Sequence, residues 1–210
     1  MNVCLFMFYD DKIKHYGDIN ARINKTYCEK YKIDFIFSNE KKYNNRHPAW
    51  ERLPLLLANI KKYDYLVWID ADAFFYYDAM DIRDVINDND DTDFIFSRDK
   101  GNININTGVF IVRNTPYSID FLTRWAYDEE LYRNNPFPIF WDQGVLMGMH
   151  RKNMLDIRHH SVILDYGVLQ HFQENEKLRY CLGKPYILHL AGENDTVRFS
   201  TSLKYHKCDH

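Results

Sequence analysis

The stretch YDYLVWIDADAFFYYD, residues 63–78, contains a continuous apolar run that ends in two aspartates. Residues 65–69 (YLVWI) predict a strand that is buried on both faces. Asp70 and Asp72 follow this strand directly, and two carboxylates held so close raise each other's pKa unless a cation lies between them. Mg²⁺ or Mn²⁺ held by one or two carboxylates commonly completes its shell with substrate phosphates. The pattern therefore predicts a metal site for a phosphorylated substrate, and the simpler alternative is a solvated loop after a strand.

The composition is that of a single globular domain. The chain has 210 residues, of which 46% are hydrophobic and 27% charged, and this is enough to bury a sizeable core. The net charge is −3 with no concentration of Lys and Arg, which argues against nucleic acid as a partner. No window approaches the roughly 18 to 20 apolar residues of a membrane span. Residues 2–9 (NVCLFMFY) suit a first strand better than a signal peptide, so we expect a cytoplasmic protein or a soluble piece of a longer one. No CxxC pair occurs, and we expect reduced core thiols at Cys4, Cys28, Cys181 and Cys208.

Strands and helices alternate along the chain. Apolar runs predict strands over residues 3–9, 34–38, 65–69, 93–97, 108–112, 162–164 and 186–190. Helical spacing of apolar residues predicts helices over residues 18–31, 49–63, 118–132 and 142–149, and the tail from residue 203 is polar. The alternation predicts an α/β fold with a mostly parallel central sheet flanked by helices and with functional groups at the carboxyl ends of strands. His189, near the end of the last strand, could reach the same edge, although a lone histidine is more often structural.

Five segments carry a resemblance to a known family. They are YGDINARINKTYCEKYKIDF (16–35), AWERLPLLLANIKKYDYLVWIDADAFF (49–75), NTGVFIVRN (106–114), WDQGVL (141–146) and LHLAG (188–192). In this order the segments resemble metal-dependent glycosyltransferases of the GT-A fold, most closely glycosyltransferase family 34, which includes galactosyl-, mannosyl- and xyloglucan xylosyltransferases. The resemblance implies one GT-A domain over residues 1–210, with a nucleotide-binding half before about residue 100 and an acceptor-side half after it.

The resemblance also implies a metal site. It places Mn²⁺ (or Mg²⁺) on Asp70, Asp72 and His189, and it gives Asp70 a further contact with the nucleotide sugar. Arg198 or Lys204, in the C-terminal segment, could close over the phosphates of the donor.

For the sugar, the resemblance implies a set of residues on the acceptor side. It places Asn106 against the donor sugar, Asp142 on sugar hydroxyls and Gln143 beside the anomeric carbon, and it brings Arg52 near the nucleotide or sugar. The alternatives are that Asn106 caps a turn and that Arg52 is a solvated charge.

Three aromatic residues are open to a packing or a binding role. Tyr9 ends the first strand, where its ring could stack on a nucleotide base, for about 1 to 3 kcal/mol, or could belong to the core. We expect Trp50 and Trp141 to be packing residues.

The function that the resemblance implies is retaining transfer of a sugar from a UDP-sugar to a hydroxyl of a glycan or glycoprotein. Most family members carry an N-terminal membrane anchor for the Golgi, and none is found in this sequence, which also resembles soluble glycosyltransferase domains of large algal DNA viruses. Two alternatives remain. The aspartates could belong to a phosphohydrolase with an aspartyl nucleophile, although Ala73 and two phenylalanines follow Asp72 where such enzymes have Thr or Val and a glycine loop. A non-catalytic module that binds nucleotide sugars or glycans is the other.

Overall fold

The computed structural model describes residues 1–100, 104–172 and 186–208. Its centre is a six-stranded sheet in the order β2-β1-β3-β6-β5-β7. The strands are β1 (Val3–Phe8), β2 (Asp34–Ser38), β3 (Tyr65–Ile69), β5 (Phe94–Arg98), β6 (Ile105–Arg113) and β7 (Ser161–Leu164). The pairs β1–β2, β1–β3 and β5–β7 are parallel, and β6 runs antiparallel to β3 and β5. The predicted α/β class and mostly parallel sheet are confirmed.

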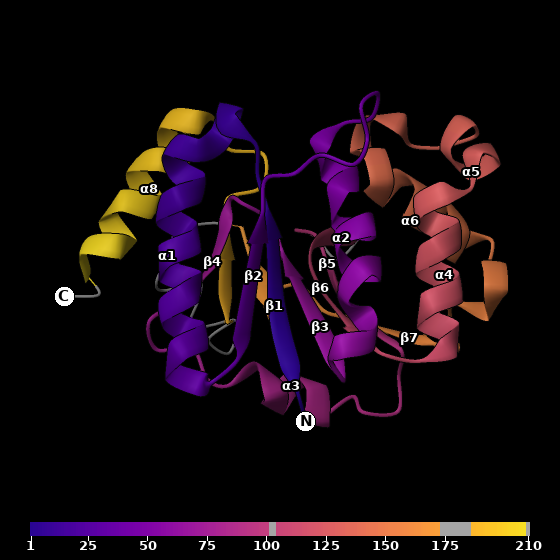
Figure 1. Cartoon of the computed structure of the whole chain (residues 1–210), viewed down its shortest axis with the longest axis horizontal. Helices are drawn as coiled ribbons and strands as arrows, with labels where there is room; N and C mark the ends of the chain where they lie inside the picture. The colour runs from indigo at the N-terminus through magenta and orange to yellow at the C-terminus, as the bar shows by residue number, and fades with distance from the viewer. Residues whose placement is uncertain (101–103, 173–185, 209–210) are drawn as a thin grey trace.

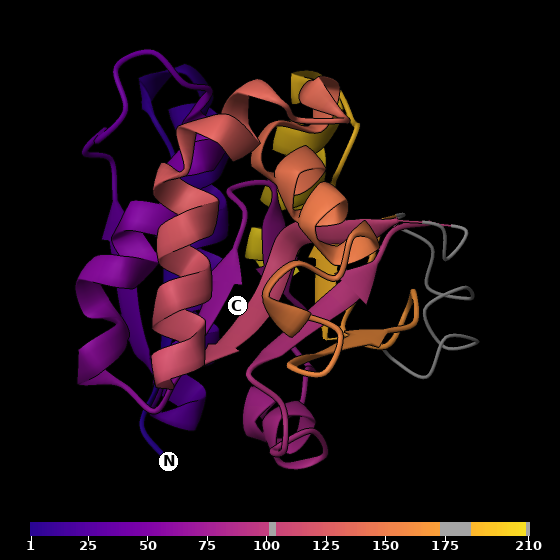
Figure 2. The ribbon, with the colours of Figure 1, turned by 90° about the vertical axis from the view of Figure 1, so that its right-hand side faces the viewer.

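Helices cover both faces of this sheet (Figure 1). On one side lie α1 (Lys14–Tyr31) and α8 (Asp195–Cys208), and on the other lie α2 (Arg52–Asn59), α4 (Pro116–Tyr127) and α6 (Trp141–Arg151). Every residue of β1 and β3 is buried, and alternate side chains enter the two core layers, with Leu5 and Val67 on the α1 side and Phe6 and Leu66 on the α2 side. In Figure 2, α4 stands in front of the sheet.

Short helices and 3-10 turns lie between these main elements. They are α3 (Ile82–Asn87), α5 (Glu129–Arg133) and the 3-10 turns Asp11–Ile13, Pro48–Glu51, Ile60–Lys62, Pro138–Phe140 and Met154–Asp156. The predicted helix over 118–132 is two helices, because Asp128 has an extended backbone and its carboxylate caps α5 by accepting from the N–H groups of Glu130 and Leu131. The predicted helix over 49–63 is α2 with a 3-10 turn at each end.

A second, smaller sheet brings the C-terminal part of the chain to the end of β3. Its order is β4-β9-β8, with β4 (Ala73–Phe75), β9 (Ile187–His189) and β8 (Gln170–His171). Ala73 of β4 pairs with His189 of β9, and the N–H of Leu190 donates to the carbonyl of Asp72 at 2.8 Å. The backbone ladder therefore places His189 beside the two aspartates, at the carboxyl end of β3.

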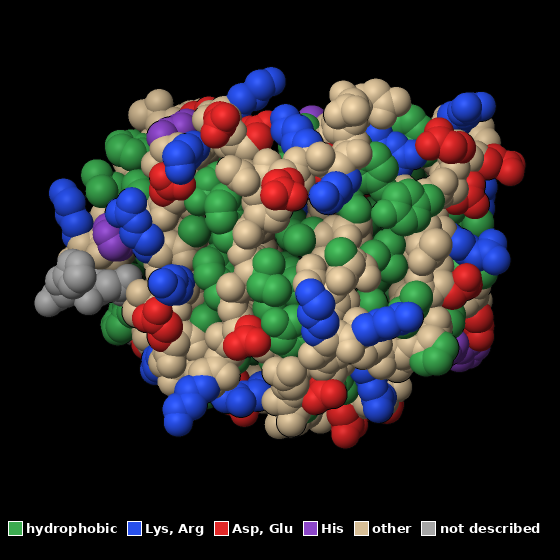
Figure 3. All heavy atoms as spheres, in the orientation of Figure 1, with side chains coloured by type: hydrophobic (Ala, Val, Ile, Leu, Met, Phe, Trp, Pro, Cys, Tyr) green, Lys and Arg blue, Asp and Glu red, His purple; other side chains and the backbone are tan. Residues whose placement is uncertain are grey.

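Two surface features and two cysteines complete the description. On the face shown in Figure 3, basic and acidic side chains are interspersed. Within the described residues no helix has the length and apolar character that crossing a bilayer requires.

Cys4 and Cys28 are buried free thiols, as predicted. Cys181 lies outside the described residues, and so does the side chain of Cys208.

Candidate active site

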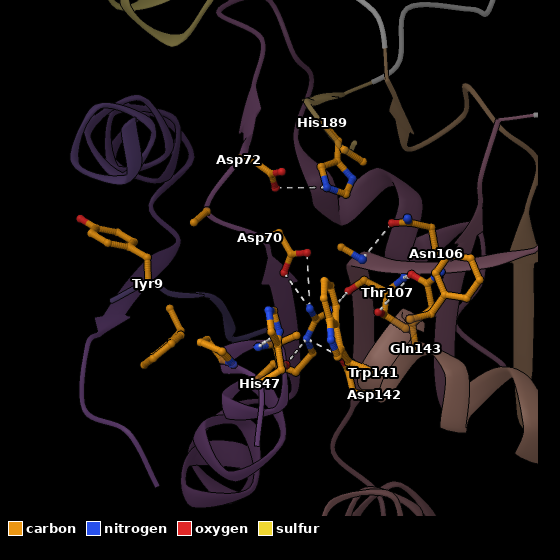
Figure 4. A pocket seen from close by; sticks show the side chains of 18 of the residues that line it. Tyr9, His47, Asp70, Asp72, Asn106, Thr107, Trp141, Asp142, Gln143 and His189 are labelled. Atoms are coloured by element: carbon orange, nitrogen blue, oxygen red, sulfur yellow. Dashed lines mark hydrogen bonds and ion pairs between the residues drawn. The ribbon is translucent and has the colours of Figure 1, made fainter. Parts of the chain in front are cut away.

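A cavity of about 650 Å³ opens at the carboxyl ends of β1 and β3. One wall carries Tyr9, which follows β1, and the opposite wall carries Asn106 of β6 and Gln143 of α6, as Figure 4 shows. Asp70 and Asp72 lie between these walls. This is the position at which open α/β sheets bind their ligands.

Asp70, Asp72 and His189 form a cluster that can hold a metal ion. One ligand atom from each residue can be chosen so that all three lie within 4.8 Å of one another, and His189 Nε2 lies 3.3 Å from Asp72 Oδ1. Two carboxylates with one imidazole supply hard oxygen ligands and a nitrogen, a set that suits Mn²⁺ or Mg²⁺. The three predicted ligands are therefore brought together, although they come from segments far apart in the sequence.

Neighbouring cations set the charge state of the two aspartates. Burial raises the pKa of Asp70, Arg52 opposes this rise, and Asp72 adds to it. Burial would also raise the pKa of Asp72, but the interactions of this carboxylate with His189 and Arg198 lower that pKa below its ordinary value. Asp72 is thus the carboxylate that the surroundings keep ionised.

Of the two predicted phosphate-binding residues, only Arg198 reaches the cavity. Its Nη2 lies 2.9 Å from Asp72 Oδ2, and its side chain lines the cavity from α8. Lys204 is exposed further along α8, is not part of the cavity lining, and has its Nζ 5.8 Å from the ring centre of Tyr205. The structure therefore does not place Lys204 beside the other predicted site residues.

Arg52 lies between two carboxylates on the floor of the cavity. Its side chain is 4% exposed, with Nη2 at 3.1 Å from Asp70 Oδ1 and Nε at 3.3 Å from Asp142 Oδ2. Its Nη1 also donates to the backbone carbonyl of Thr107. The alternative of a solvated charge is wrong for Arg52, because the guanidinium is buried and every side of it meets an acceptor.

Asp142, at the start of α6, is 1% exposed. Burial raises its pKa from 3.8 to about 7. The charge of Arg52 lowers this pKa, and the charge of Asp70 raises it further. At neutral pH this carboxyl group therefore exchanges a proton within the ordinary working range of an enzyme.

The amides of Gln143 and Asn106 are held in fixed orientations. Gln143 Oε1 accepts from Thr107 N at 3.1 Å and lies 3.4 Å from Thr107 Oγ1. Asn106 Oδ1 accepts from Gly108 N at 2.8 Å, but both residues lie inside β6, so this bond does not cap a turn before the strand. Asn106 also lines the cavity.

Tyr9 is packed into the core, one of the two roles that the sequence left open. The residue is buried, its ring stacks on Phe37 with centroids 4.3 Å apart, and its hydroxyl donates to Asp18 at 2.7 Å. Gly17 permits this position, because a Cβ there would lie 2.8 Å from the ring. Tyr9 still borders the cavity, and its stacking on a base stays a prediction.

The aromatic rim of the cavity was missed from the sequence. Trp50 is buried, as expected of a packing residue, but Trp141 is 45% exposed and lines the cavity. Its ring stacks on that of His47, with ring centroids 3.6 Å apart and an angle of 1° between the planes. The backbone of Trp141 has a φ of +48°, which is strained for a bulky residue, and such strain is common at functional sites. Ile139 beside it is 74% exposed. A signal was present in PFPIFW (136–141), where apolar residues follow prolines outside any predicted element.

Comparisons with known proteins agree with this geometry. The family model described as nucleotide-diphospho-sugar transferase matches residues 4–198. Xyloglucan 6-xylosyltransferase 4 of Arabidopsis thaliana is 27% identical over 127 residues, which cover 56% of this chain and 25% of that protein. The match thus spans only about a quarter of the length of this curated relative.

Solved structures share the fold. A glycosyltransferase involved in glycosylation of the major capsid of PBCV-1 aligns with a TM-score of 0.78 and 13% identity, over 97% of this chain and 100% of that one. The glycosyltransferase GlyE of Streptococcus pneumoniae aligns with a TM-score of 0.60 and 13% identity, over 98% of this chain and 60% of that one. These likenesses confirm the predicted GT-A fold. Because the family model matches almost the whole length of the chain, the chain belongs to the nucleotide-diphospho-sugar transferase family.

Proposed function

We propose that the protein transfers a sugar from a nucleoside diphosphate sugar, with UDP as the nucleotide, to a hydroxyl group of a glycan or glycoprotein. The observation that carries this proposal is the cluster of Asp70, Asp72 and His189 within 4.8 Å in a cavity lined by Asp142 and Gln143. The family supports a nucleotide-sugar donor. The name of the Arabidopsis relative supports a glycan acceptor.

In this proposal Asp70, Asp72 and His189 hold Mn²⁺ or Mg²⁺. When bound, the ion supplies Lewis-acid stabilisation of the leaving diphosphate, which removes the need for a protein general acid there. Arg198 adds a second positive charge at the same place, since its guanidinium already contacts Asp72. Its planar fork suits bidentate contact with phosphate oxygens.

The remaining donor contacts follow from the two walls of the cavity. The base stacks on the part of Tyr9 that lines the cavity, and the sugar lies against Asn106, Asp142 and Gln143 on the opposite wall. Arg52 holds Asp142 in place for contact with sugar hydroxyls.

We propose a retaining outcome by attack on the same face of the sugar. In this scheme the departing phosphate assists the acceptor hydroxyl, and Gln143 stabilises the sugar without forming a covalent bond. A double displacement would need a carboxylate free to attack, whereas Asp142 is buried against Arg52. The hydrogen bond from Thr107 N to Gln143 Oε1 supports a positioning role for this amide.

For the acceptor we propose the aromatic rim at the Gln143 end of the cavity. Trp141 and Ile139 are exposed there and line the cavity. A flat aromatic ring with an exposed aliphatic residue near it in sequence suits the apolar face of a pyranose ring. This rim supports a glycan as the acceptor. A cytoplasmic site of action stays a prediction.

The proposal is tested by calorimetry with UDP in the presence and absence of Mn²⁺. We expect wild-type protein to bind UDP only with Mn²⁺, and Asp72→Ala to lose this binding while a cooperative thermal transition shows that the variant is folded. Asp120→Ala, which removes an exposed carboxylate on α4, is the matched control and should bind as wild type does. UDP binding that is indifferent to Mn²⁺, with no transfer to any acceptor, would favour the non-catalytic module, and rapid release of phosphate from a simple phosphomonoester would favour the phosphohydrolase.

A further inference from the structure

A buried chain of hydrogen bonds connects His189 to the backbone of β6. Gly108 N donates to Asn106 Oδ1 at 2.8 Å, and Gln170 Nε2 donates to the same oxygen at 3.1 Å. The other end of the Gln170 amide, Oε1, lies 2.8 Å from His189 Nδ1. Gln170 is fully buried and is not part of the cavity lining. It therefore reaches the candidate metal site only through His189.

The chain of bonds determines which nitrogen of His189 carries a proton. A backbone N–H can only donate, so the atom of Asn106 that Gly108 meets must be oxygen. The atom of Gln170 that meets this oxygen must then be the amide nitrogen, and the remaining Gln170 atom is an oxygen that can only accept. His189 Nδ1 must therefore be the donor. In the neutral ring this leaves the lone pair on Nε2, the nitrogen that faces Asp72 at 3.3 Å.

The ring of His189 is also held sterically. A Cβ on Gly108 would lie 2.1 Å from His189 Cε1, so the ring lies directly against the backbone of β6. Phe172 meets the ring edge-on, with centroids 5.2 Å apart and planes at 84°. With Gln170 on Nδ1, these contacts hold the ring with Nε2 towards the aspartates.

We infer that Gln170 is a positioning residue for the metal site, which holds His189 in the tautomer and orientation that direct the Nε2 lone pair at the position shared with Asp70 and Asp72. This inference rests on the proposed function, because it takes His189 as a metal ligand. Partners of this kind typically change metal affinity by about 10- to 100-fold when they are removed. Gln170 lies outside the motifs of the sequence, in a strand of two residues.

The test compares three substitutions with wild-type protein, and no measurement requires catalysis. Gln170→Leu removes both hydrogen bonds at similar volume. Gln170→Glu keeps an acceptor for His189 Nδ1 but loses the donor to Asn106. Asn59→Leu removes a buried amide on α2 that does not contact His189 and does not line the cavity, and it is the matched control for metal affinity. Calorimetry measures Mn²⁺ affinity, and two-bond ¹H–¹⁵N correlation spectra of the metal-free protein report the tautomer of His189 at about pH 8.5, where an ordinary imidazole is neutral.

We expect wild-type protein to carry its imidazole proton on Nδ1 of His189. Gln170→Leu should shift the ring to a mixture of tautomers and weaken Mn²⁺ binding by about 10- to 100-fold, whereas Gln170→Glu should restore both to near wild-type values. Asn59→Leu should leave both unchanged. If Gln170→Leu does not fold, Gln170→Met takes its place, because it has the same length and no hydrogen-bonding amide.

The outcomes separate this inference from the proposed function. Equal Mn²⁺ affinity and an unchanged tautomer in the Leu or Met variant would overturn the role of Gln170 while leaving the metal site intact. If wild-type protein shows the Nδ1–H tautomer but binds no Mn²⁺, the proposed metal site fails instead. If the Leu and Met variants bind Mn²⁺ more weakly but keep the wild-type tautomer, the loss is one of packing, and the positioning role is refuted.

Discussion

Replacement of Asp142 by Asn should make the protein more stable at alkaline pH than at acidic pH, relative to wild type. The carboxyl group of Asp142 is buried, and burial raises its pKa from 3.8 to about 7 even though Arg52 opposes the rise. Between these two pH values the native state holds a proton that the unfolded chain has released. Stability from this group is therefore present at low pH and falls as the pH rises towards about 7, because the native state binds more protons than the unfolded state.

The size of the effect follows from the shift. Three pKa units correspond to about 4 kcal/mol at 1.36 kcal/mol per unit, and about 2 kcal/mol of this lies between about pH 5.5 and about pH 8. For a domain of this size, 1 kcal/mol moves the melting temperature by about 2 to 4 °C. Asparagine has nearly the same shape and no charge, and Arg52 keeps its contact with Asp70 in the variant.

Thermal unfolding in EDTA at about pH 5.5 and about pH 8 measures this change. We expect the melting temperature of Asp142→Asn, relative to wild type, to rise by about 4 to 8 °C between the two conditions. Asp120→Asn, at an exposed site on α4, should show no such change. The same difference from wild type at both pH values would refute the reasoning, because it would mean that Asp142 does not titrate in this range. Sugar transfer should fall in the variant, since the carboxylate is proposed to contact the donor.

Three further substitutions test separate parts of the cavity. Gly108→Ala should weaken Mn²⁺ binding at least 10-fold, because its Cβ would lie 2.1 Å from His189 Cε1 and would displace the ring; unchanged affinity in calorimetry would contradict this. Tyr9→Ala should weaken UDP binding by about 1 to 3 kcal/mol at saturating Mn²⁺, and an affinity equal to wild type would show that no base stacks there. Trp141→Ala should raise the KM for a glycan acceptor while UDP affinity stays unchanged; a loss of UDP affinity instead would place the ring at the donor.

The long buried strands could be predicted from the sequence, because a run such as VCLFMF (3–8) is apolar on both faces and fits a parallel sheet. The position of Asp70 and Asp72 followed from the same logic, since they come directly after β3. The short strands β4 and β8 could not be predicted. Runs of three and two residues carry no readable period, and β4 pairs with β9, which is far from it along the chain.

The helix α8 and the burial of Arg52 also could not be predicted from the sequence. In α8 the buried side chains include Thr201 and Ser202, so the helix lacks the apolar stripe on which such predictions depend. Arg52 is buried because carboxylates from two other segments meet it, and charges are rarely buried without such partners. The sequence shows each of these charged residues but does not show that they lie side by side in the fold. For the same reason the link from Gln170 to His189 becomes visible only in the structure.

Arg52 links the two ends of the cavity. One edge of its guanidinium faces Asp70 at the metal end. Its Nε donates to the carbonyl of Ala49 and lies 3.3 Å from Asp142 Oδ2 at the sugar end. The remaining Nη1 donates to the carbonyl of Thr107, the residue whose N–H holds Gln143 Oε1. Because the guanidinium is planar and rigid, a displacement of any one of these groups strains the contacts of the others. A lysine ammonium at this position could not face all three directions from one fixed plane, so the site requires arginine for its geometry as well as for its charge.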